Sequence, residues 1–198
     1  MRPLMNKEEG RERLLELGEI LDRVEVSYFL ILGTALGAYR DKGFVPTERD
    51  IDIGFLYEDF QERLQPMISF LQEAQWSVRL ESKPFDRTRV LFAEKNGVKA
   101  DLVSYVKYKD KRFCHNTDPS LTYAIVHDAE LLEQRELVSM FDRFWDVPSP
   151  CDVYLGLEYG THDWKEARDT HLSKTRVANF LDKEGINNDY LQQLDLSK

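Results

Sequence analysis

The segment Asp50-Ile51-Asp52-Ile53-Gly54-Phe55 alternates between acidic or small residues and apolar ones, which is the period of a half-buried β-strand. Asp50 and Asp52 are therefore expected to share one face of this strand. Neighbouring carboxylates repel each other and oppose β-propensity. A divalent cation offsets that cost, because Mg²⁺ prefers one or two carboxylates together with water and phosphate oxygens. The pattern predicts a metal site, and the simpler alternative is a solvated edge strand or a capped turn.

The residues before this strand predict a helix, a short strand and a loop. Apolar residues recur at helical spacing from about Lys7 to Arg23, which predicts an amphipathic helix. Ser27 to Leu32 reads as a buried strand that ends at Gly33. A short helical stretch from Ala35 to Arg40 and a loop from Asp41 to Arg49 lead into Asp50.

The residues after the acidic strand predict a second helix and an antiparallel continuation of the sheet. Helical spacing runs from Tyr57 to Ala74, and β-formers fill Trp76 to Leu80, Arg87 to Ala93 and Val98 to Val106. Asn96-Gly97 is a favoured hairpin turn between the last two strands. We expect loops and short helices beyond Asp118. The chain is thus predicted to be one α+β domain over residues 1–198, with a mixed sheet flanked by helices and a loop-rich and helical C-terminal cap.

Further candidate site residues lie around the acidic pair. Gly33 and Thr34 follow a buried strand, so the backbone there can approach a phosphate and Thr34 can donate from its hydroxyl and amide. The alternative is a simple tight turn. Asp101 alternates with the apolar residues of its strand and is expected to meet Asp50 and Asp52 across the sheet, or else to be a solvated strand residue.

Three arginines are candidate phosphate ligands, because a guanidinium group matches phosphate oxygens bidentately; they are Arg40, Arg87 and Arg89. Neither a GxGxxG nor a GxxxxGK[ST] pattern occurs in the chain, which argues against dinucleotide-binding and P-loop sites.

Composition restricts the class of partner. A formal net charge of -9, without a dense Lys/Arg stripe, disfavours a nucleic acid partner. No stretch approaches the roughly 18 consecutive apolar residues of a membrane span, and the polar first ten residues do not resemble a signal peptide. We therefore expect a cytoplasmic protein. Cys114 and Cys151 lack the spacing of a zinc site and are expected to be two lone thiols.

Two ordered blocks of the sequence resemble the LicD and fukutin family. The first block reads Leu32-Gly33-Thr34-Ala35-Leu36-Gly37-Ala38-Tyr39-Arg40, then Lys42-Gly43-Phe44-Val45-Pro46, then Asp50-Ile51-Asp52-Ile53-Gly54. The second reads Val147-Pro148, then Tyr154-Leu155, then Tyr159-Gly160-Thr161-His162-Asp163-Trp164. Where the family usually has more acidic residues before its pair, this chain has Thr47-Glu48-Arg49, and Leu32 replaces the first residue of a usual Gly-Gly.

The resemblance implies a nucleotidyltransferase-like fold and the transfer of a phosphocholine or phosphopolyol group from a CDP-linked donor to a sugar, glycan or polyol acceptor. It also implies Mg²⁺ or Mn²⁺. By position, Asp50 and Asp52 match the family's metal-binding pair, Asp101 matches its third carboxylate, and Gly33 with Thr34 matches its phosphate-side turn. Tyr159 and Trp164, in the second block, are expected to pack a terminal segment onto the core rather than to line a pocket.

Two alternatives to this function remain open. The same carboxylates serve a nucleotidyltransferase, which moves a nucleoside monophosphate from a nucleoside triphosphate to a small molecule. A noncatalytic binding protein with the same fold is the other alternative, and a broken carboxylate set would favour it. Asp50, Asp52 and Asp101 are all present, so the enzyme is the leading interpretation.

Overall fold

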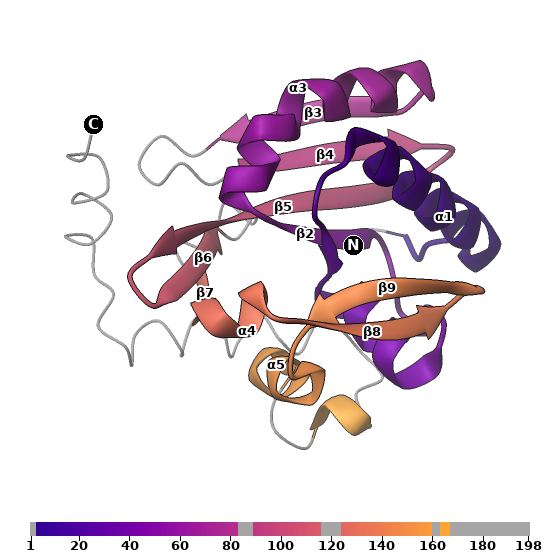
Figure 1. Cartoon of the computed structure of the whole chain (residues 1–198). Coiled ribbons are helices and arrows are strands. Elements are labelled where there is room, and N and C mark those ends of the chain that lie inside the picture. Colours follow the sequence, from indigo (N-terminus) through magenta and orange to yellow (C-terminus); the bar gives the residue numbers. More distant parts are fainter. Residues whose placement is uncertain (1–2, 83–88, 116–123, 160–162, 167–198) are drawn as a thin grey trace.

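The computed structural model of the chain describes residues 3–82, 89–115, 124–159 and 163–166. Its centre is a mixed sheet in which the strands lie side by side in the order β1-β2-β5-β4-β3 (Figure 1). These strands are β1 (Phe29–Leu30), β2 (Ile51–Leu56), β5 (Val98–Tyr108), β4 (Arg89–Lys95) and β3 (Ser77–Ser82). Only β2 and β5 are parallel to each other in this series, and the other neighbours are antiparallel.

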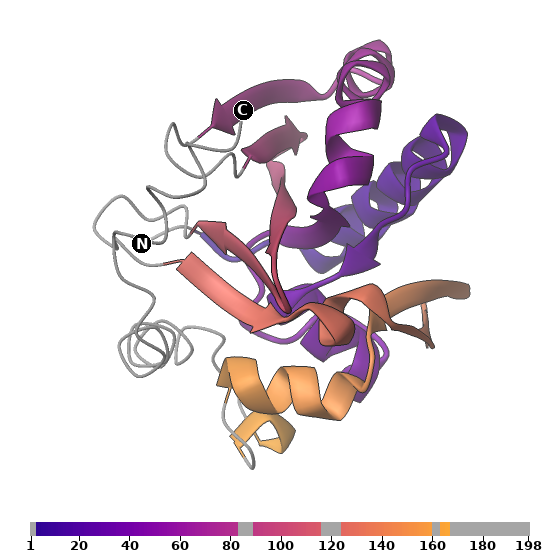
Figure 2. The ribbon, with the colours of Figure 1, turned by 60° about the vertical axis from the view of Figure 1, so that its left-hand side comes forward.

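Helices α1 (Lys7–Val24) and α3 (Tyr57–Glu73) pack together on one side of the sheet, and Figure 2 shows α5 (Cys151–Tyr159) apart from them. The Asn6 side chain caps α1 by accepting hydrogen bonds from the Glu8 and Glu9 amides. The ring of Phe55, in β2, lies 5.3 Å from that of Phe60 in α3. Ile51, Ile53 and Phe55 therefore face the helices, which leaves Asp52 on the opposite face of β2.

The strands around the hairpin are those that the sequence predicts. β4 and β5 are joined at Asn96 and Gly97, both of which have positive φ angles, 52° and 78°. This is the backbone that an Asn-Gly hairpin turn requires. The predicted helices before and after the acidic strand are also confirmed as α1 and α3.

Two predictions about the chain before the acidic strand need correction. The strand that ends at Gly33 is only two residues long, because β1 pairs with β2 through Phe29 and Leu30 alone. Helix α2 (Leu32–Leu36) then begins earlier than expected and continues into a π-helical turn, η1 (Gly37–Asp41). Gly33 and Thr34 thus lie in the first turn of a helix rather than in a loop before it.

The prediction of loops and short helices beyond Asp118 is wrong for residues 124–128, 135–140 and 143–148, which form strands. β6 (Lys111–His115) and β7 (Ala124–Asp128) continue the sheet from the end of β5, and β8 (Arg135–Met140) and β9 (Arg143–Pro148) form a separate antiparallel pair. Among the residues that the structure describes beyond Asp118, helical structure consists of α4 (Ala129–Glu133), α5 (Cys151–Tyr159) and the short η2 (Asp163–Lys165). The strands of this region form by pairing with other strands, although their own sequences carry weak strand signals.

Within the described residues, no helix is both long enough and apolar enough to cross a bilayer. Cys114 and Cys151 are both buried and unpaired as disulfides.

Candidate active site

Asp52 and Asp101 are brought together by the parallel pairing of β2 and β5. The two residues are partners in the strand register, so their side chains project from the same face of the sheet. Each is 9% exposed. The sequence alternation therefore correctly predicts the face of the sheet on which Asp101 lies and its position beside Asp52.

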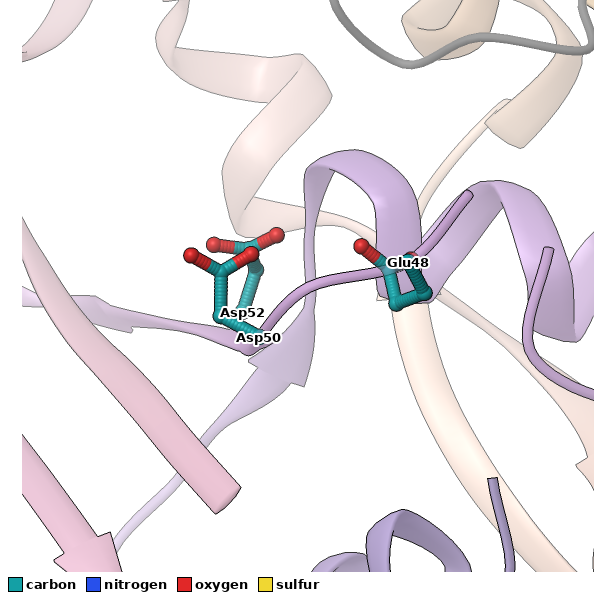
Figure 3. A group of neighbouring side chains, drawn as sticks. All are labelled: Glu48, Asp50 and Asp52. Atoms are coloured by element: carbon teal, nitrogen blue, oxygen red, sulfur yellow. The ribbon is translucent and has the colours of Figure 1, made fainter. Parts of the chain in front are cut away.

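Asp50 and Asp52 also meet a third carboxylate, that of Glu48. One carboxylate oxygen from each of these residues lies within 4.8 Å of the others. Figure 3 shows the Asp50 and Asp52 side chains pointing the same way from the start of β2, with Glu48 reaching toward them from the preceding loop. We call Glu48, Asp50 and Asp52 the acidic cluster. Glu48 is absent from the site residues predicted above, because it lies in the loop before β2, where the two-residue period of a strand does not apply.

The acidic cluster holds unfavourable negative charge. Burial, followed by the charges of Asp50, Glu48 and Asp101, raises the pKa of Asp52 well above its ordinary range. Burial, followed by the charge of Asp50, raises the pKa of Glu48 to about 8. A site of this kind favours uptake of protons or of a cation, either of which offsets the repulsion.

Residues 31–34 hold the backbone of Asp52 from two sides. The Asp52 amide donates a hydrogen bond of 2.9 Å to Thr34 Oγ1, and the Ile31 amide donates one of 3.2 Å to the Asp52 carbonyl. Thr34 is fully buried, so its observed contact is with the strand that carries Asp52. A phosphate contact of Thr34 stays a prediction.

Gly33 makes room for the Glu48 carboxylate. A Cβ atom at this position would lie 2.5 Å from Glu48 Oε2, which is closer than real side chains approach. Glu48 Oε1 accepts a hydrogen bond from the Arg49 amide, whereas Oε2 is buried without a hydrogen-bond partner among the described residues. An unpartnered buried oxygen beside other carboxylates fits a hard cation such as Mg²⁺ or Mn²⁺, which takes oxygen ligands.

The predicted arginine ligands lie in different surroundings. Arg40 is paired with Asp41 at 2.7 Å and donates to the Trp164 carbonyl at 2.9 Å. Arg89 lies on the same face of β4 as Leu91 and Ala93. Phe92, the register partner of Asp101, lies on the opposite face. Arg87 lies outside the described residues. All three remain predictions as phosphate ligands.

Residues of the second sequence block are packed into the protein. Tyr159 and Trp164 are 3% and 8% exposed, and the Trp164 ring meets that of Tyr39 edge-on at 5.8 Å. This agrees with the packing role expected for both. Close by, His127 Nε2 of β7 lies 2.8 Å from Glu158 Oε1 of α5, and both side chains are buried. No local pattern in the sequence marks this pair.

Comparison with known proteins places these features in a family. The model of the LicD/FKTN/FKRP nucleotidyltransferase domain matches residues 25–152, which include the whole acidic cluster and Asp101. Ribitol-5-phosphate transferase FKTN of Mus musculus is 29% identical over 174 residues, or 81% of this chain and 36% of that protein. The Homo sapiens protein of the same name is 24% identical over the same shares of both chains. The chain thus spans about a third of the length of these relatives.

A solved structure shares the fold. The antibiotic-resistance factor ANT(2'')-Ia, in solution, aligns with a TM-score of 0.53 over 97% of this chain and 94% of its own, at 15% identity. This likeness supports the nucleotidyltransferase-like fold that the sequence resemblance implies. With a family model that covers most of its length and the acidic residues in place, the chain belongs to the LicD/FKTN/FKRP family.

Proposed function

We propose that this protein catalyses the metal-dependent transfer of a phosphate-linked group, phosphocholine or phosphopolyol, from a CDP-activated donor to a sugar, glycan or polyol acceptor. The observation that carries the proposal is the convergence of the Glu48, Asp50 and Asp52 carboxylates, with Asp101 on β5 as the register partner of Asp52. Membership of the LicD/FKTN/FKRP family supports a phosphate-linked transfer. The name of the relatives, ribitol-5-phosphate transferase, favours an alcohol phosphate as the group that moves.

The carboxylates have two roles in this proposal, metal binding and proton acceptance, according to their positions. Asp50, Asp52 and Glu48 are the residues that would hold Mg²⁺ or Mn²⁺, because their oxygens converge and Glu48 Oε2 is buried without a hydrogen-bond partner in the part of the chain that the structure describes. When bound, the cation neutralises phosphate charge and draws electron density from the phosphorus. Asp101 approaches from the neighbouring strand and is the residue that we assign to accept the proton of the acceptor hydroxyl.

Residues around the carboxylates fix the geometry of the site. Thr34 and Ile31 hold the Asp52 backbone, and Gly33 leaves space for Glu48. A fixed array of this kind lowers the reorganisation that phosphate transfer requires. Contacts of Arg40 and Arg87 with the donor phosphates are part of the proposal, whereas Arg89 is left out because it lies on the face of β4 opposite to that of Asp101. For Arg40 such a contact must compete with Asp41.

Product identity tests the proposal. The purified protein with Mg²⁺ or Mn²⁺ is incubated with CDP-choline, CDP-ribitol or CDP-glycerol and a panel of phosphorylated sugars and glycans, and nucleotide products are separated by chromatography. The expected result is CMP that appears only with a suitable acceptor and only with metal, because attack occurs at the phosphorus attached to the transferred group.

Other products support other functions. Pyrophosphate released from a nucleoside triphosphate, with no turnover of any CDP donor, indicates the nucleotidyltransferase alternative. Saturable binding of a CDP donor without CMP release across the acceptor panel indicates the noncatalytic alternative. Asp101→Asn is the matched variant: it should still bind metal and donor but release CMP at least about a hundredfold more slowly, as expected for loss of a general base.

A further inference from the structure

The side chain of Tyr154, in helix α5, contacts residues 31–34, the segment that frames the acidic cluster. The Leu32 amide donates a hydrogen bond of 3.0 Å to the hydroxyl of Tyr154, across 122 positions of sequence. Tyr154 is fully buried. It also lies beyond residues 25–152, the range that the family model matches. The role of the Tyr154 hydroxyl therefore follows from its contacts alone.

Leu32 holds an unusual backbone conformation. Its φ angle is 47°, in the left-handed region that a leucine rarely adopts because its Cβ crowds the following carbonyl. Conformations of this kind persist where surrounding contacts stabilise them. The Tyr154 hydroxyl is such a contact, because it fixes the amide of the residue that carries the strain.

The residues on either side of Leu32 are those that hold the acidic cluster. Ile31 donates to the Asp52 carbonyl, Thr34 accepts from the Asp52 amide, and Gly33 lies against the Glu48 carboxylate. A change in the Leu32 backbone would rotate these neighbours away from Asp52 and Glu48. The conformation at Leu32 is thus linked to the placement of two carboxylates.

Tyr154 lies beside a close, buried contact between α5 and β7. Glu158 lies one turn further along α5 and meets His127 of β7 at 2.8 Å. The His127 ring lies 5.3 Å from that of Tyr154. Both members of the pair are less than 5% exposed, so they fasten α5 to the sheet on the side where Tyr154 points toward Leu32.

We propose that Tyr154 is a positioning residue: its hydroxyl fixes the Leu32 amide and thereby sets residues 31–34, which place Asp52 and Glu48 for the reaction. The idea rests on the proposed function for its catalytic consequence, but its structural part is independent of turnover. In this role the Tyr154 hydroxyl acts on the active site through the backbone of residues 31–34.

The test removes one hydroxyl and follows the backbone in metal-free protein. Tyr154→Phe keeps the ring, so packing is retained. Residue-resolved amide hydrogen exchange by NMR should show faster exchange at Leu32 and Asp52, with the amides of α1 unchanged. Mn²⁺ affinity, measured by electron paramagnetic resonance, should fall on the order of fivefold, the equivalent of one net hydrogen bond.

Tyr28→Phe is the matched control, since the Tyr28 hydroxyl donates a hydrogen bond to Asp22 and accepts a part-buried one from Arg143, away from residues 31–34. It should leave Leu32 exchange and Mn²⁺ affinity at wild-type values. Equal exchange at Leu32 in wild type and Tyr154→Phe overturns the proposal. If the variant does not fold, a wild-type Leu32 amide that exchanges as fast as an exposed amide overturns it instead.

Failure of the proposed function gives a different result. A wild-type protein that binds no Mn²⁺ and turns over no CDP donor removes the catalytic consequence, while the exchange data still decide whether Tyr154 fixes Leu32. Wild-type metal binding and turnover, with both unchanged in Tyr154→Phe, leave the function intact and reject the positioning role.

Discussion

Asp52 and Asp101 are register partners on the parallel strands β2 and β5, and each is 9% exposed. Parallel neighbours require a crossover, which here consists of α3, β3 and β4. The crossover brings acidic residues from distant parts of the sequence to one face of the sheet, where Glu48 and Asp50 join Asp52. The mutual repulsion of these carboxylates should affect the pH dependence of stability and the affinity for metal.

The first prediction concerns pH and the stability of the metal-free protein. The pKa of Glu48 rises from its ordinary 4.5 to about 8 on folding, and that of Asp52 rises as well. A raised pKa means that the folded state binds more protons than the unfolded state between these values, so the stabilisation present below about pH 4.5 is lost as pH rises through about 8. Urea unfolding should give a lower free energy of unfolding at pH 8 than at pH 5.5.

Glu48→Gln is the control for this prediction, because it removes a titrating group and keeps the size of the side chain. The variant should show a smaller loss of stability over the same pH interval. A wild-type protein whose stability rises steadily toward pH 8 without metal would show that these carboxylates are not strained by folding.

The second prediction concerns the space that Gly33 leaves for Glu48. In Gly33→Ala, the new methyl group would lie 2.5 Å from Glu48 Oε2, so the carboxylate must move away. Because the displaced atom is the end of a flexible side chain, stability should fall by only about 1 kcal/mol or less. Mn²⁺ affinity should fall about tenfold or more, as is typical when support of a ligand is disturbed.

Gly43→Ala is the matched substitution, since the nearest atom to its new methyl group is a Phe141 ring carbon at 3.8 Å, an ordinary contact. Its Mn²⁺ affinity should equal that of the wild type. Equal affinities for the Gly33 and Gly43 variants would exclude Glu48 from the metal site.

The third prediction concerns the backbone at Leu32. At most helical positions alanine is more stable than glycine by about 1 kcal/mol. The order should reverse here, with Leu32→Gly more stable than Leu32→Ala by about 1 kcal/mol, because φ is 47° and only glycine adopts this region without a Cβ penalty. Both variants lose the leucine side chain, so chemical denaturation of the pair isolates the backbone effect. Greater stability of the alanine variant would contradict a left-handed conformation at this residue.

Local patterns in the sequence predict much of the fold and part of the site. The helix over α1, the acidic strand and the Asn96-Gly97 hairpin follow from spacing and turn chemistry, which depend on residues near one another in the chain. Asp50, Asp52 and Asp101 follow from the same two-residue period. These are features for which neighbouring residues hold all the information.

Other features depend on contacts between distant segments. Apolar residues lie on both faces of the β8-β9 pair: Val138 and Trp145 are buried, whereas Leu137 and Phe144 are 66% and 70% exposed, so the sequence alone does not show which face is buried. Glu48 lies before the strand, where the loop alone decides that its carboxylate turns toward Asp50. The contact of Tyr154 with Leu32, and that of His127 with Glu158, exist only after the elements have packed.

Mn²⁺ binding to the wild type and to Asp52→Asn tests the metal centre most directly. Electron paramagnetic resonance titration should show a specific site in the wild type that Mg²⁺ displaces and that Asp52→Asn loses. The thermal unfolding temperature of the metal-free variant should be unchanged or slightly higher, because a buried carboxylate repelled by its neighbours is removed. The hydrogen bond from the backbone amide of residue 52 to Thr34 Oγ1 persists. Undiminished Mn²⁺ affinity in a folded Asp52→Asn protein would contradict the assignment of this cluster as the metal centre.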